Sequence, residues 1–105
     1  MPPTLPGYKI WEYLTPLTIA GSPVFSPWID STGFTTVYPF FFTAAGTLTV
    51  TMEGSTDAAT LDTDFGSVTI TSGTAVPLQA PFIRFKLVQT VADGTRTKVF
   101  MQARA

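Results

Sequence analysis

The acidic residues come closest to a catalytic set in this 105-residue sequence. It contains no histidine and no cysteine, so imidazole bases, imidazole–zinc sites and Ser-His or Cys-His nucleophile pairs are absent. Two carboxylates facing one cleft can still hydrolyse a glycosidic bond. We recognise no catalytic motif among the acids, and we expect no enzyme, no catalytic residue and no cofactor. The seven candidates for a carboxylate pair are Glu12, Asp30, Glu53, Asp57, Asp62, Asp64 and Asp93.

Three of these acids, Asp57, Asp62 and Asp64, fall within one polar stretch. Calcium prefers several carboxylate and carbonyl oxygens at short range, which such a loop can supply. The spacing does not match the twelve-residue calcium-loop pattern, and an acidic loop between strands is normally just solvated. We therefore assign no metal site, and calcium binding by this loop stays an open alternative.

The tryptophans and tyrosines offer a second kind of site. Aromatic faces combined with polar groups can hold a sugar ring, whereas scattered aromatic residues in a β-sandwich more often belong to the core. A carbohydrate- or receptor-binding module is therefore an alternative to a purely structural role. The rings that could build a stacking platform are Tyr8, Trp11, Tyr13, Trp28 and Tyr38.

The composition favours a surface covered by other protein. The sequence is 45% hydrophobic and only 12% charged, whereas an ordinary domain carries about 25% charged residues. A net charge of −1 gives no field that would attract nucleic acid. The longest apolar stretch, residues 37–45, is interrupted by Pro39 and is far too short to span a membrane. We expect neither a nucleic-acid nor a membrane partner, and we see no signal peptide.

Strand signals recur about every ten residues, and no segment keeps a helical period. Residues 34–43 predict a central strand that breaks or bulges near Pro39. Residues 46–53 alternate threonines with Leu48, Val50 and Met52, which is typical of a half-buried strand. We expect these two strands to pair as a short hairpin through residues 44–46.

The second half of the chain predicts two further hairpins. One joins residues 65–71 to 74–80 through a turn at Ser72 and Gly73. The other joins a strand after Pro81 to residues 98–103 through Asp93 and Gly94. The expected fold is all-β: a single antiparallel β-sandwich or jelly-roll-like barrel of about eight short strands. It occupies residues 8–105, preceded by an extended proline-rich arm at residues 1–7.

Residues 8–14 form a strand with bulky side chains on both faces. Strict alternation gives the strand two faces: one has Tyr8, Ile10, Glu12 and Leu14, and the other has Lys9, Trp11 and Tyr13. Such a strand is either sandwiched inside the domain or pressed against another subunit. If it contacts a partner, the arm and this strand supply the interface. We predict the contact residues Leu5, Tyr8, Trp11 and Tyr13.

Four stretches resemble small β-sandwich modules of tailed-bacteriophage virions: SPWIDSTGFTTV at residues 26–37, AGTLTV at 45–50, EGSTD at 53–57 and APFIRFKL at 80–87. In such modules the residue after the loop aspartate is frequently glycine, where this chain has Ala58. The resemblance implies a non-enzymatic virion structural protein, made in the host cytoplasm. A free-standing module favours a capsid decoration or cement protein that binds the major capsid protein or another virion protein as a homo-oligomer, with a trimer favoured. A module of a phage tail or head fibre is the alternative.

Overall fold

Alternation of apolar and polar residues produces strands throughout the described part of the chain. The computed structural model describes residues 8–14, 22–43, 46–62, 64–65, 67–90 and 97–104. The predicted arm at residues 1–7 therefore lies outside the described residues. No helix long and apolar enough to cross a membrane occurs within these ranges. Their strands are β1 (Tyr8–Tyr13), β2 (Val24–Phe25), β3 (Ile29–Asp30), β4 (Thr36–Thr43), β5 (Leu48–Ser55), β6 (Ser67–Ile70), β7 (Val76–Pro77), β8 (Phe82–Gln89) and β9 (Thr97–Arg104).

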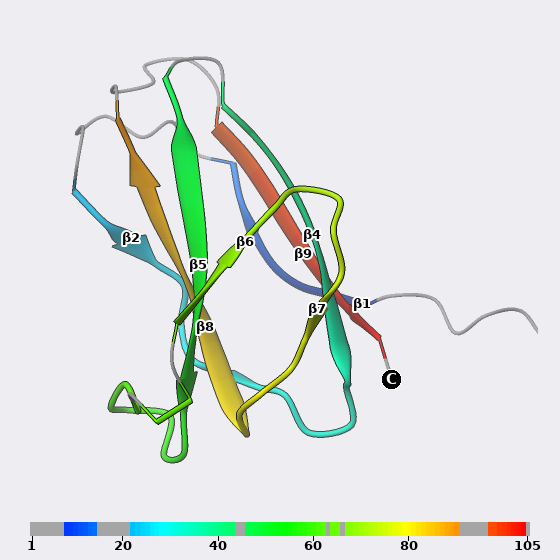
Figure 1. Ribbon diagram of the computed structural model, residues 1–105. Helices are drawn as coiled ribbons and strands as arrows, with labels where there is room; N and C mark the ends of the chain where they lie inside the picture. Colours follow the sequence, from blue (N-terminus) through cyan, green and yellow to red (C-terminus); the bar gives the residue numbers. More distant parts are fainter. Residues whose placement is uncertain are drawn as a thin grey trace, which may run out of the picture.

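The strands form two antiparallel sheets that pack against each other (Figure 1). Sheet A has the order β1-β9-β4-β7, and sheet B has the order β2-β8-β5-β6, with β3 also paired to β8. The pairings are nested: β1 with β9, β2 and β3 with β8, β4 with β7, and β5 with β6. This nesting is the connectivity of a jelly roll, a double-sheet sandwich. The predicted all-β sandwich is confirmed.

The three predicted hairpins are wrong. Strands β4 and β5 lie in different sheets, as do β6 and β7, and β8 and β9. The turn at Ser72 and Gly73 does form, since the Thr74 N–H donates to the Thr71 carbonyl and Gly73 has a positive φ of 82°. Asp93 and Gly94 lie outside the described residues. A turn signal specifies that the chain reverses, but it does not specify which strand receives the returning chain.

The core lies between the two inner faces and follows the predicted alternation of the central strands. In β5 the buried apolar side chains are Leu48, Val50 and Met52, as expected, and Glu53 and Ser55 are buried as well. In β8 every second residue is buried, beginning at Ile83. Burial of this apolar surface is the main driving force for joining the two sheets. Sheet A contributes Val37, Val76, Val99 and Met101 to the same cluster.

Strand β4 continues without a break through Pro39, so the predicted bulge there is wrong. The register with β9 runs unbroken from Thr36 to Thr43. The Pro39 carbonyl accepts from the Gly73 N–H at 2.7 Å, so it points away from β9. Because the backbone N and carbonyl of one strand residue point to the same side, the missing N–H of Pro39 costs no bond to β9.

A β-bulge in β1 brings Trp11 and Tyr13 to the core side, where strict alternation predicts Ile10, and Ile10 packs against the core as well. The register with β9 shifts between Lys9 and Trp11, which leaves Ile10 as the extra residue. Trp11 then lies opposite the buried Met101, and Tyr13 opposite the buried Val99. Directly opposite residues share one face of a sheet. Trp11 and Tyr13 therefore point into the core instead of lying opposite its core-facing residues.

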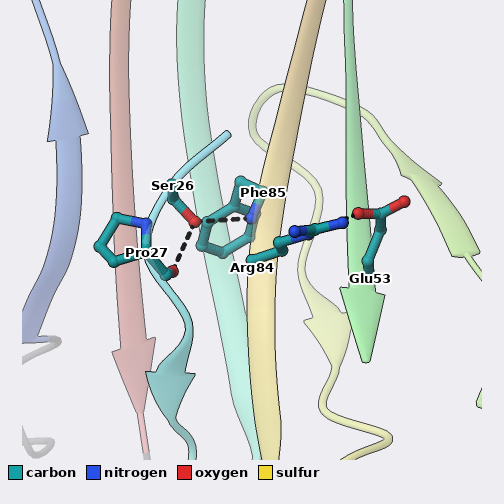
Figure 2. A network of polar contacts seen from close by, with 5 residues as sticks. All are labelled: Ser26, Pro27, Glu53, Arg84 and Phe85. Atoms are coloured by element: carbon teal, nitrogen blue, oxygen red, sulfur yellow. Dashed lines mark hydrogen bonds and ion pairs between the residues drawn. The ribbon is translucent and has the colours of Figure 1, made fainter. Parts of the chain in front are cut away.

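A serine bridges the interruption between β2 and β3. Ser26 is buried, and its hydroxyl accepts from the Phe85 N–H at 2.8 Å while donating to the Pro27 carbonyl at 2.9 Å (Figure 2). The Ser26 N–H also donates to the Phe85 carbonyl. Strand β8 therefore keeps its hydrogen bonds where its edge partner turns away.

Replacing Ser26 tests this bridge. Ser26→Ala leaves the buried Phe85 N–H without its acceptor, so we expect a loss of about 1–3 kcal/mol in the free energy of unfolding. Urea unfolding followed by tryptophan fluorescence measures it. Ser67→Ala is the matched control, because Ser67 is exposed in β6, and it should change stability by less than about 0.5 kcal/mol. Equal effects of the two variants would contradict the assignment.

Candidate functional site

The outer face of sheet A carries a row of aromatic side chains. In β4 the inward positions are Val37 and Pro39, which are buried, so Tyr38, Phe40 and Phe42 point outward. In β9 the inward positions are buried in the same way, and the outward ones begin at Lys98. The register places Phe40 opposite Phe100. We call the side chains of Tyr38, Phe40, Phe42, Lys98, Phe100, Gln102 and Arg104 the aromatic face.

Three rings of the aromatic face are open to solvent. Phe40 is 45% exposed, Phe42 is 49% exposed and Phe100 is 37% exposed. They border an open groove that is also lined by Ser72 and Lys98. Contiguous exposed rings are uncommon on monomers, and aromatic residues are enriched in protein interfaces. The aromatic face is therefore the candidate site.

Sequence reasoning missed these residues, although the signal was present. Residues 36–43 have bulky side chains on both faces of the strand, with Val37 and Phe41 on one face and Phe40 and Phe42 on the other. The same two-faced pattern predicts an interface at residues 8–14. A run of aromatic residues indicates a buried core strand as readily as an exposed one, and only the pairing of β4 with β9 separates the two.

The predicted contact residues do not gather on this face. Leu5 lies outside the described residues, and Tyr8 is placed only by its backbone pairing with Ala103. Trp11 and Tyr13 pack against the core, and Trp11 stacks on Phe85 with ring centroids 5.8 Å apart and planes 12° apart. Their contact with a partner stays a prediction.

On the outer face of sheet B, an arginine side chain lies over the aromatic rings. The Arg84 guanidinium lies 4.3 Å from the Phe25 ring centroid and 4.5 Å from that of Trp28. Its Nε also donates to the Glu53 carboxylate at 2.8 Å (Figure 2). Arg84 thus takes ring surface on which a sugar would stack. The rings predicted to form a stacking platform are also dispersed. Trp28 lies under Arg84 of sheet B, Tyr38 lies under Arg104 of sheet A, and Trp11 packs on the core.

The acidic loop after β5 uses its carboxylates to hold its own backbone. Oδ1 of Asp57 accepts from the Ser55 hydroxyl and from the N–H groups of Ala59 and Thr60, each at 2.9 Å. Asp62 accepts similarly from the Asp64 N–H. Within the described ranges, no group of three or more His, Cys, Asp or Glu residues could hold a metal ion. The carboxylates have a structural role in the turn.

Comparisons with protein-family models, with curated proteins and with solved structures give no significant match.

Ala58 provides a test of the loop geometry. Its φ is +60°, in the left-handed region, which costs a non-glycine residue about 1–2 kcal/mol. Ala58→Gly removes this strain but gives the unfolded chain more freedom, so we expect a net gain of up to about 1 kcal/mol. Ala59→Gly, one residue along, should instead lose stability by up to about 1 kcal/mol. Both free energies come from urea unfolding, and a change of the same sign in both variants would contradict this geometry.

Asp57 gives a pH-dependent test. Hydrogen bonds from the N–H groups of Thr60 and Ala59, and then from the Ser55 hydroxyl, lower the pKa of Asp57. A lowered folded-state pKa stabilises the fold above the unfolded-state pKa of about 3.9, and the contribution is lost as pH falls through the folded-state value. Asp57→Asn keeps an acceptor but removes the charge. We expect its stability deficit at pH 6 to shrink as the pH falls below 4, measured by urea unfolding. A deficit independent of pH would contradict the role of the charge.

Proposed function

We propose that this chain is a non-enzymatic virion structural protein: a capsid decoration or cement protein that binds and stabilises the capsid as an oligomer. The four sequence stretches that resemble phage virion modules support the virion location. The jelly-roll connectivity is compatible with it, since viral capsid proteins use this architecture, although lectin domains use it too. Fold alone does not decide function, so the proposal depends on a surface.

The aromatic face is the observation that carries the proposal. Phe40, Phe42 and Phe100 expose 45%, 49% and 37% of their surface on one side of one sheet. Burying such rings against another protein removes apolar area from water at roughly 25 cal/mol per Å². Aromatic anchors are the residues that most often dominate binding free energy. The low charge content of the sequence, 12%, supports the same interpretation.

The oligomer is proposed to form away from the aromatic face, so that the face remains free for the capsid. Strand β1 lies at the end of sheet A, and an edge strand has unpaired backbone groups that can meet a neighbouring subunit. We therefore propose that the homo-oligomer contact forms along the edge of β1 and the arm at residues 1–7, beside the predicted residues Tyr8, Trp11 and Tyr13, of which Trp11 and Tyr13 also pack against the core. The protein partner on the other surface is the major capsid protein or another virion protein.

The double variant Phe40→Ser/Phe100→Ser tests the proposal. We expect the wild-type chain to co-sediment with empty capsid shells of the virus that encodes it, assembled without this protein. Removing two central rings should weaken binding at least about tenfold, because each anchor contributes on the order of 1 kcal/mol or more. Circular dichroism and thermal unfolding show whether the variant keeps its fold.

Phe25→Ser is the matched control for this experiment. Phe25 is 43% exposed but lies at the outer side of sheet B under Arg84, so its loss should leave shell binding within about twofold. A wild-type chain that does not bind the shells would overturn the proposed function. Equal weakening by both variants would show that the aromatic face has no special part in it.

A further inference from the structure

The aromatic face carries a positive charge at each end. Lys98 lies opposite Phe42 in the register, and Arg104 lies opposite Thr36. The Arg104 guanidinium stacks over the Tyr38 ring at 4.3 Å from its centroid. The two cations are six residues apart on β9, which is about 20 Å along a strand. The exposed rings of Phe40 and Phe100 lie between them.

Neither cation has an acidic partner among the described residues. On the same sheet Lys9 pairs with Glu12 at 2.9 Å, and on the other sheet Arg84 pairs with Glu53 at 2.8 Å. No such pair forms to Lys98 or Arg104 within the described ranges. The Nε of Arg104 is buried and has no hydrogen-bond acceptor there.

A second copy of the chain does not fit this face. In a two-fold dimer that packs two aromatic faces together, Lys98 of one copy meets either Lys98 or Arg104 of the other, depending on the direction of the axis. Both arrangements bring like charges together across an apolar interface, which is unfavourable. Glu12 lies directly opposite Phe100 in the register, but its carboxylate already pairs with Lys9 of the same chain.

We infer that the aromatic face binds a different protein. The surface of that partner is apolar at its centre and carries carboxylates on two sides, about 20 Å apart. One carboxylate accepts from Arg104 and the other pairs with Lys98, while the apolar centre covers the phenylalanine rings. The inference rests on the proposed function, under which this partner is the capsid protein. Single-stranded nucleic acid also combines stacking with cations, but the net charge of −1 disfavours it.

Charge reversal at each end tests the inference on the same empty capsid shells. We expect Lys98→Glu and Arg104→Glu each to weaken shell binding about tenfold or more, because each places two carboxylates in opposition. Wild-type binding should also weaken as salt rises from 50 to 500 mM, as expected for charge pairs that salt screens. Arg104→Met removes the charge but keeps an apolar side chain over Tyr38, so its effect on shell binding distinguishes loss of charge from loss of packing. Lys86→Glu is the matched control, because Lys86 lies on the outer side of β8 in sheet B, and it should bind within about twofold of wild type.

Each outcome decides a separate point. If charge reversals bind like wild type while Phe40→Ser/Phe100→Ser has lost binding, the aromatic face is used but its partner is not acidic, and the inference is wrong while the proposed function stands. Sedimentation equilibrium of the chain alone tests self-association. If the wild-type chain self-associates and Phe40→Ser/Phe100→Ser does not, a second copy covers the aromatic face and the inference is wrong. Binding of a ten-nucleotide oligothymidine that Lys98→Glu weakens would replace the protein partner with nucleic acid. Absence of wild-type shell binding would overturn the proposed function itself.

Discussion

The stack of Trp11 on Phe85 is the contact on which the arrangement of the molecule depends. Phe85 is fully buried at the middle of β8, and Trp11 reaches it from β1 in the opposite sheet. For Trp11 to point inward at its place opposite Met101, β1 needs the extra residue at Ile10. The bulge in turn leaves Lys9 and Glu12 on the outer side, where they pair with each other. The outer side of sheet A is therefore polar along β1 and aromatic along β4 and β9.

A second contact between the sheets closes one end of the core with polar groups. The Gln89 side chain of β8 donates to the Thr43 hydroxyl at 2.6 Å and accepts from the Thr97 hydroxyl at 3.2 Å. Gln89 and Thr97 are almost fully buried. A hydrogen-bonded amide in a core favours one relative placement of its partners, because displacement leaves buried polar groups unpaired. The apolar stack and this polar bridge together fix how the two sheets lie, and with them the direction in which the aromatic face points.

Local alternation was sufficient to predict the strands but not their partners. Leu48, Val50 and Met52 in β5, and Ile83, Phe85 and Leu87 in β8, are buried as their spacing indicates. The hairpins failed because a jelly roll pairs strands that are distant in sequence, such as β1 with β9, and turn residues carry no information on that choice. The faces of β1 could not be predicted either, since a single extra residue at Ile10 exchanges them. The aromatic face depends on both pieces of missing information.

The two sheets differ in how their exposed rings are covered, and this difference argues for a directional assembly. On sheet B, Arg84 lies over Phe25 and Trp28, and Glu53 neutralises its charge. Arg84 and Glu53 therefore satisfy each other's charge within the chain, although Phe25 stays 43% exposed. On sheet A, Phe40 and Phe100 stay exposed, and Arg104 stacks on Tyr38 without an acid among the described residues. Under the proposed function, the surface that meets the shell is the outer side of sheet A, which has the larger number of exposed rings. The proposed attachment to a shell requires such a difference between the two outer surfaces, because one side must bind while the opposite side faces solvent.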